Sequence, residues 1–264
     1  MTINAITLLD LDDTVFQTSR KCPEDIPHVD LTPYAFGTDG NPISYATPSQ
    51  VAFIRWLETT TRVVVVTARS VDALLRSKVK FQTAVAAHGG AIIGRASTAK
   101  SGEYALYTEW HKLMETQLQA YKADLNSIIQ SVNLDADLHR IDVRARVIEE
   151  QGLPLYVVVK HGLKDGNDPE LYHACASTTK NLPPGWTAHV NGNNVAYMPP
   201  GLGKEHAVKW LLPQLKEDHP GMPVIGIGDS FTDAGFMQLC DFAMTPTASQ
   251  LSTKIFGSKF GQAA

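Results

Sequence analysis

Two short aspartate-rich stretches contain the side chains best suited to chemistry. DLDDT places Asp10 and Asp12 two positions apart, and GDSFTD places Asp229 and Asp233 four positions apart. Carboxylates gathered at one point repel one another, by about 4 kcal/mol for two unit charges 4 Å apart at an effective dielectric constant of ~20. A divalent cation relieves this repulsion, and an all-oxygen ligand set favours Mg²⁺. The two stretches therefore predict a Mg²⁺ site if the fold brings them together.

A buried strand is expected directly before each of three polar residues, Asp10, Thr67 and Asp229. Runs of apolar and β-branched residues without alternation are typical of a parallel sheet covered on both faces. Ligands of such open sheets bind at the carboxyl ends of the strands, so the three residues are expected to line one pocket. The strands are predicted at Ile3–Leu9, Val63–Val66 and Pro223–Ile227.

Other elements of this α/β part are read from caps and apolar spacing. Thr47, Pro48 and Gln50 supply an N-cap, a proline in the first turn and a capping-box partner for a helix. Residues 17–47 are rich in Pro, Asp, Thr and Gly and are expected to form a long loop. Further helices are predicted at 72–81, 204–212 and 233–239, and short strands at 85–87 and 242–244.

The middle of the chain has a different pattern. In the segment 141–148, apolar residues alternate with Asp142, Arg144 and Arg146, as in a strand with one buried face. The stripe that starts at Arg140 faces either a substrate or plain solvent. Helices are predicted at 107–132 and 169–179, and strands at 141–148, 155–160, 186–190 and 195–198, the last two joined around Asn191-Gly192.

These elements predict two domains. Residues 1–89 and 199–264 would form an α/β core, a Rossmann-like parallel sheet with helices on both faces. Residues 90–198 would form an inserted α+β domain, an antiparallel sheet with helices on one face.

Composition excludes several classes of protein. The chain has 264 residues, a formal net charge of −4, 44% hydrophobic and 19% charged residues, which is typical of a globular protein. It lacks the basic stripe of a nucleic-acid binder. Its longest aliphatic run, Val63–Val66, is far shorter than a membrane span. Three dispersed cysteines predict neither disulfides nor a zinc site, and we expect a cytoplasmic protein, a monomer or dimer.

The motifs resemble those of the haloacid dehalogenase superfamily of phosphotransferases. DLDDT is similar to its first motif, VVVVTAR (63–69) to its second, the lysine of GLGKEHAV to its third and GDSFTD to its fourth. The large gap between the second and third motifs is where class II caps are inserted. The insert pattern is similar to the B subtype of Cof-type sugar phosphatases and sucrose phosphatases. GLGK is not a nucleotide-binding P-loop, because Met198 and Glu205 replace required residues.

The resemblance implies a role for each motif residue. Asp10 would be the nucleophile that forms an aspartyl-phosphate, and Asp12 the general acid and base. Mg²⁺ would be held by Asp10, the backbone carbonyl of Asp12, and Asp229, with Asp233 as a further ligand or close support. Thr67 and Lys204 would bind phosphoryl oxygens and belong to the catalytic set. The implied substrate-binding residues are Thr14, Thr67, Arg69, Lys204 and Arg144.

The implied activity is Mg²⁺-dependent hydrolysis of a small phosphorylated metabolite, such as a sugar or polyol phosphate, with neither nucleic acid nor membrane as a partner. A phosphomutase of the same fold and a non-catalytic regulatory binding protein are the alternatives. Three features depart from the family pattern: Asp13 stands where Gly is frequent, Thr232 stands where Cof-type proteins have Asn, and the segment 17–47 is long.

Overall fold

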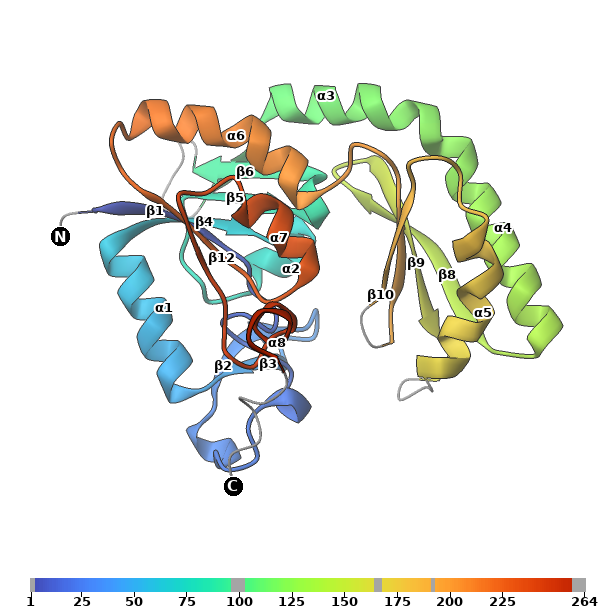
Figure 1. The fold of residues 1–264 in the computed structure, drawn as a ribbon, viewed down its shortest axis with the longest axis horizontal. Coiled ribbons are helices and arrows are strands. Elements are labelled where there is room, and N and C mark those ends of the chain that lie inside the picture. The colour runs from blue at the N-terminus through green and yellow to red at the C-terminus, as the bar shows by residue number, and fades with distance from the viewer. Residues whose placement is uncertain (1–2, 96–102, 164–167, 191–192, 258–264) are drawn as a thin grey trace. The chain divides into compact units, whose positions relative to one another are not determined.

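The computed structural model describes residues 3–95, 103–163, 168–190 and 193–257. The chain divides into two compact units, the first made of Met1–Thr108 with Lys204–Ala264 and the second of Glu109–Gly203 (Figure 1). The first unit is therefore assembled from both ends of the chain, and the second is inserted within it.

The first unit is built on a seven-stranded sheet in the order β13-β12-β1-β4-β5-β6-β7. The five strands from β13 to β5 are parallel, and β6 and β7 continue the sheet in antiparallel pairing. The four inner parallel strands β12, β1, β4 and β5 consist largely of buried residues, as expected for a sheet covered on both faces, whereas the edge strand β13 is exposed. Their bounds are β1 Ala5–Leu9, β4 Thr61–Val66, β5 Thr83–Ala86, β6 Ala91–Arg95, β7 Tyr104–Leu106, β12 Val224–Ile227 and β13 Phe242–Met244.

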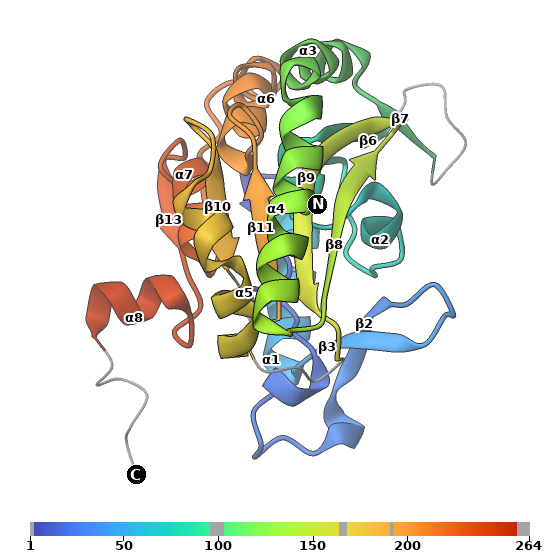
Figure 2. The same cartoon turned by 90° about the vertical axis from the view of Figure 1, so that its right-hand side faces the viewer.

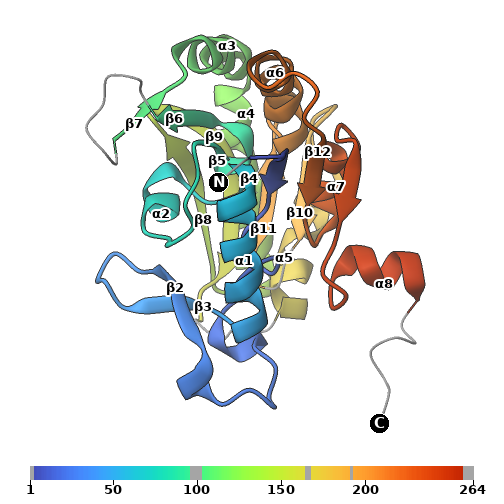
Figure 3. The same ribbon diagram turned by 90° about the vertical axis from the view of Figure 1, so that its left-hand side faces the viewer.

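Helices cover both faces of this sheet. Helices α1 (Pro48–Thr60) and α2 (Val71–Leu75) pack on one face, while α6 (Lys204–Asp218) and α7 (Phe231–Met237) lie on the other (Figure 3). The start predicted for α1 is confirmed, because Thr47 and Gln50 form a reciprocal capping box. A short helix α8 (Gln250–Phe256) and the 3₁₀ turn η3 (Ala87–Gly89) complete the unit.

Two predictions for this unit were wrong in part: the long loop at 17–47 and the helix at 72–81. The loop segment contains a hairpin of β2 (Thr32–Phe36) and β3 (Pro42–Ala46), together with the 3₁₀ turns η1 (Ser19–Lys21) and η2 (His28–Asp30). Helix α2 ends at Leu75 because the chain beyond it pairs with the hairpin instead. The backbone N–H of Lys78 donates to the Tyr34 carbonyl at 2.8 Å, and Ser77 forms a bridge with Ala35.

The second unit contains an antiparallel sheet in the order β10-β11-β9-β8. Helices α4 and α5 cover one face of it, and their apolar residues pack on alternate residues of the strands (Figure 2). The expected one-sided sheet is therefore confirmed. The bounds are α3 Thr108–Leu118, α4 Lys122–His139, β8 Val143–Glu150, β9 Leu153–His161, α5 Asp168–Lys180, β10 Thr187–Val190 and β11 Val195–Met198.

Two expectations for the insert differ from the structure in their bounds. The single helix expected at 107–132 is two helices separated by the 3₁₀ turn η4 (Gln119–Tyr121), and the second continues to His139 because Val132 and Ala136 extend its buried stripe. The insert was expected to begin at residue 90, but strand β6 pairs with β5 in the first unit's sheet. The turn residues Asn191-Gly192 lie outside the described residues.

The described helices include none that combines the length and the apolar character of a membrane span. Cys22, Cys175 and Cys240 are all free thiols, as their dispersed positions predicted.

Candidate active site

The carboxyl edge of the parallel sheet brings the two aspartate motifs together. The register aligns Leu9 of β1 with Ile227 of β12 on one side and with Val65 of β4 on the other. Asp10 follows this row, and its backbone N–H donates to the Ile227 carbonyl at 2.9 Å. The chain then turns sharply, with Asp13 at a φ of 62°. This left-handed backbone favours Gly and is tolerated by Asp, which accounts for the departure from the family pattern at this position.

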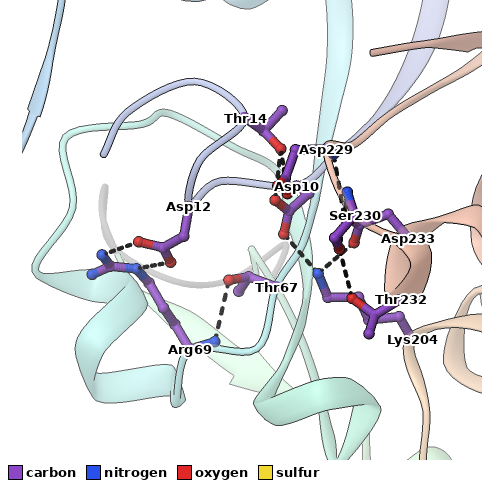
Figure 4. Close-up of polar contacts among 10 residues, drawn as sticks. All are labelled: Asp10, Asp12, Thr14, Thr67, Arg69, Lys204, Asp229, Ser230, Thr232 and Asp233. Carbon is purple, nitrogen blue, oxygen red and sulfur yellow. Dashed lines mark hydrogen bonds and ion pairs between the residues drawn. The ribbon is translucent and has the colours of Figure 1, made fainter. Parts of the chain in front are cut away.

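Three carboxylates converge at this edge (Figure 4). Asp10, Asp229 and Asp233 each offer an oxygen atom, and these atoms all lie within 4.8 Å of one another. Thr14 donates to Asp10 at 2.7 Å and makes a longer contact of 3.4 Å with Asp229. The fold thus brings the DLDDT and GDSFTD motifs together, as the sequence predicted.

Lys204 bridges two of these carboxylates. Its Nζ donates to Asp10 at 2.6 Å and to Asp233 at 2.7 Å, and all three side chains are at most 5% exposed. Burial opposes the charge of Lys204, but the two carboxylates outweigh it and raise the pKa of the lysine. The ammonium group therefore stays charged, at the first residue of α6.

The carboxylates of the cluster differ in their tendency to ionise. Burial raises the pKa of Asp10 to about 7, against the lowering effect of Lys204. Burial, followed by the charges of Asp10 and Asp233, raises the pKa of Asp229 to about 7. Burial acts in the same direction on Asp233, but Lys204 outweighs it and the pKa of that carboxyl falls. Asp10 and Asp229 are thus not fully ionised at neutral pH unless further positive charge is placed beside them.

This donor set fits a hard divalent cation. Carboxylate oxygens close together, two of them on groups whose ionisation is disfavoured, are what a Mg²⁺ ion would stabilise. Asp10 and Asp229 are the residues that would bind it directly, because Asp233 is already occupied. One Asp233 oxygen accepts from Lys204, and the other accepts from the Ser230 hydroxyl at 2.7 Å and from the backbone N–H groups of Ser230 at 3.0 Å and Asp229 at 3.2 Å.

Asp12 lies apart from the cluster. Arg69 donates to both of its carboxylate oxygens, from Nε and from Nη2, at 2.7 Å each (Figure 4). The guanidinium group lies over the Phe16 ring, 5.1 Å from its centroid, and also donates to Ser44 at 3.3 Å. Phe16 and Ser44 thus hold the Arg69 side chain in place, and Arg69 in turn holds the carboxylate of Asp12.

The remaining expected residues fall in two places. Thr67 is buried at the end of β4, where its hydroxyl accepts from the backbone N–H of Arg69 at 3.2 Å. Arg144 lies in the second unit, exposed on β8, and its guanidinium group donates to the Gly162 carbonyl.

Sequence reasoning missed Ser230, Ser44 and Phe16. Ser230 had a readable signal, because Ser230 and Asp233 have the spacing of a capping box, and this box starts α7. Ser44 and Phe16 had none, since they reach Arg69 only through the hairpin and the turn after β1.

Comparisons with known proteins show the fold. No family model and no curated protein sequence matches the chain. Among solved structures, the sucrose-phosphatase from Synechocystis sp. PCC6803, in complex with sucrose and phosphate, matches with a TM-score of 0.53 and 12% identity over 97% of this chain and 90% of that one. The C-terminal domain of the C. albicans trehalose-6-phosphate phosphatase matches with a TM-score of 0.54 and 12% identity, covering 89% and 72%.

A third match is an IMP-bound variant of the Plasmodium falciparum IMP-nucleotidase, with a TM-score of 0.56 and 12% identity over 95% of this chain and 66% of that one. At these identities the likeness concerns the fold alone. The α/β fold with an inserted α+β unit, expected from the sequence, is confirmed, and it is the fold that these three structures share.

Proposed function

We propose that the chain is a Mg²⁺-dependent phosphomonoester hydrolase that acts on a small phosphorylated metabolite, a sugar or polyol phosphate, through an aspartyl-phosphate. The observation that carries the proposal is Asp10, a buried carboxylate bonded to Lys204 and placed beside Asp229 and Asp233. The sugar-phosphate and nucleotide phosphatases that share the fold support the reaction class. The three free cysteines support a cytoplasmic location.

The first step would be attack of an Asp10 carboxylate oxygen on phosphorus, with loss of the bond to the leaving oxygen. Lys204, at 2.6 Å from Asp10, would hold a phosphoryl oxygen together with the buried Thr67 hydroxyl. Positioning and neutralisation of charge make up most of the catalysis of phosphoryl transfer. Mg²⁺ bound to Asp10 and Asp229, with Asp233 in support, would supply further positive charge near the phosphoryl oxygens.

Asp12 would protonate the leaving oxygen in this step. In the second step it would take a proton from water, whose oxygen attacks phosphorus and releases inorganic phosphate from Asp10. In the structure both carboxylate oxygens of Asp12 accept bonds from Arg69, so the carboxylate has to turn from Arg69 toward the phosphoryl group to take part in these proton transfers. Arg69 is in this view the residue that holds Asp12 between turnovers.

The inserted unit would act as a class II cap of the B subtype. Its order α4-β8-β9-α5-β10-β11, with both helices on one face of the sheet, supports this assignment. The expected backbone contribution of Asp12 to metal binding and the substrate contacts of Thr14 and Arg69 remain part of the same proposal.

The test is release of inorganic phosphate by the full-length chain from a panel of phosphorylated metabolites, with Mg²⁺ present. Asp10→Asn is expected to lower kcat at least 1,000-fold, within the range of losses for groups that act together. Asp25→Asn, the same chemical change at an exposed position, is the matched control. Asp10→Asn with more than a tenth of the parent's kcat would exclude Asp10 as the nucleophile, and phosphate returned to the sugar instead of to water would indicate a mutase.

A further inference from the structure

Helix α8 follows all four motifs in the sequence, yet it is bonded to an aspartate of the carboxylate cluster. The backbone N–H of Leu251, in its first turn, donates to the Asp229 carbonyl at 3.0 Å. The N–H of Asp229 itself donates to the Asp233 carboxylate at 3.2 Å. One residue earlier, the N–H of Gly228 donates to the Met244 carbonyl of β13 at 3.2 Å. Both backbone polar groups of Asp229 are thus bonded, which restrains its φ and ψ and leaves the side chain to rotate only about its own bonds.

Two hydroxyl groups hold the start of α8 opposite Asp229. Ser249 is the N-cap, and its hydroxyl oxygen accepts from the backbone N–H of Ser252 at 3.0 Å. The same oxygen lies 2.8 Å from the hydroxyl of Thr245, which follows β13 directly. The chain between β13 and α8 is therefore closed into a loop that presents the first turn of the helix to Asp229. We call residues 245–252 the α8 brace.

The rest of α8 has little hold on the protein. Figure 3 shows α8 at the margin of the first unit, where it packs against α7. Ser252 is buried and Leu251 half-buried, whereas the residues from Thr253 to Phe256 are exposed. A helix of seven residues is not stable by itself in water, because too few hydrogen bonds offset the cost of its first turn. The stability of α8 thus depends on the first turn, which contains both the cap and the bond to Asp229.

We propose that the α8 brace positions Asp229 for the cation, so that Leu251 is a positioning residue of the metal site through its backbone N–H. The inference rests on the proposed role of Asp229 as a ligand of Mg²⁺. Asp229 and Asp10 bind one ion only when both carboxylates point to it, and an unheld Asp229 backbone would leave this arrangement in part of the molecules. The apparent affinity for Mg²⁺ falls in proportion to the fraction of molecules in the binding-competent arrangement. By linkage, Mg²⁺ stabilises the brace by the same factor.

The test removes one N–H group from the full-length chain. Replacing Leu251 by its α-hydroxy analogue turns the amide into an ester, which keeps the side chain but cannot donate to Asp229. The same replacement at Gln250 is the matched control, because the N–H of that residue, the first of α8, has no partner among the described residues. Calorimetric titration with MgCl₂ measures the affinity, and hydrogen exchange of the metal-free proteins measures how well the turn at residues 228–233 is held.

The ester at Leu251 is expected to weaken Mg²⁺ binding at least threefold and to speed exchange at residues 228–233 at least threefold, in the range for loss of one hydrogen bond. The ester at Gln250 is expected to change neither by more than about 1.5-fold, because the first N–H of a helix has no intrahelical partner. In the parent chain, Mg²⁺ is expected to slow exchange within residues 250–256, and the ester at Leu251 should reduce this effect.

A second set of variants tests the brace without an ester. Ser249→Ala removes the N-cap and is expected to weaken Mg²⁺ binding about twofold, whereas Ser249→Asn should restore the parent's affinity because Asn is an equally good N-cap. Thr253→Ala removes an exposed hydroxyl from the same helix and is the control. A purely structural contribution of α8 would lower the melting temperature of the variants without changing the affinity for Mg²⁺.

Failure of the inference is distinguishable from failure of the proposed function. A parent chain that binds Mg²⁺ but releases no phosphate refutes the hydrolysis, and the same binding data still decide the role of the brace. The inference alone is overturned if the parent binds Mg²⁺ and the ester at Leu251 matches the ester at Gln250 in affinity and exchange. A parent chain that binds no Mg²⁺ overturns the metal site and the positioning role together.

Discussion

Binding of Mg²⁺ is expected to depend strongly on pH, because the cation must displace protons from the carboxylate cluster. In the metal-free protein the pKa values of Asp10 and Asp229 are both about 7. A carboxyl with this pKa is about 10% ionised at pH 6 and about 90% ionised at pH 8. The apparent affinity for Mg²⁺ should therefore rise about tenfold between these pH values if one proton is displaced and about 100-fold if two are.

The same groups set the sign of the effect on stability. A carboxyl whose pKa is raised on folding stabilises the folded state fully below its unfolded value, 3.8, and loses this contribution as pH rises through about 7. The metal-free protein should thus become less stable over this range. Added Mg²⁺ should offset the loss, so that its stabilising effect grows with pH.

Calorimetric titration of the metal-free full-length protein with MgCl₂ at pH 6, 7 and 8 measures the affinity. Repeating it in buffers of different ionisation enthalpy counts the protons released. Asp229→Asn removes one titrating group and should weaken binding and reduce the pH dependence, whereas the exposed Asp25→Asn should leave both unchanged. An affinity that differs by less than threefold between pH 6 and pH 8, with no proton release, would refute the reasoning.

Three further outcomes are expected. Lys204→Met should lower kcat 100-fold or more and destabilise the metal-free protein by about 3–5 kcal/mol, because it leaves buried carboxylates unpaired. Steady-state kinetics measures the first effect and urea unfolding the second. A decrease in kcat of less than threefold would contradict the proposed role of Lys204 in binding the phosphoryl group. Gly228→Ala should cost about 1–3 kcal/mol in unfolding free energy, since its Cβ would lie 2.5 Å from that of Asp233, and full stability would contradict this packing. Thr47→Ala should cost about 1 kcal/mol through loss of the N-cap, whereas Thr59→Ala, at a half-buried position near the end of the same helix, should cost less. Equal melting temperatures would contradict the capping.

The core elements were readable because their signals are local. Uninterrupted aliphatic runs indicated buried parallel strands, and the carboxyl ends of such strands form one edge whatever the rest of the fold. Asp10 and Asp229 could therefore be placed together before their distance was known. The capping box at Thr47 and Gln50 likewise depends on residues three positions apart.

The hairpin within 17–47 had no such signal. Each of its strands has a proline among its first two residues and shows little alternation. The strands pair with each other and with residues 77 and 78, so their stability comes from contacts distant in sequence. That pairing also ends α2 at Leu75, where local spacing favoured a longer helix. Local sequence patterns do not show this competition between helix propensity and tertiary pairing.

The sequence by itself determined which reactive side chains follow which elements: aspartates after two strands, a threonine after a third, and a lysine at the start of a helix. Tertiary structure decided how these groups are shared. Lys204 reaches both Asp10 and Asp233, while Asp12, two residues from Asp10, turns to Arg69. The physical reason is that the partners of each side chain are set by the register and crossovers of strands that lie far apart in sequence. The burial of each carboxyl group at the carboxyl edge of the sheet then determines its pKa, and no local sequence pattern contains this information.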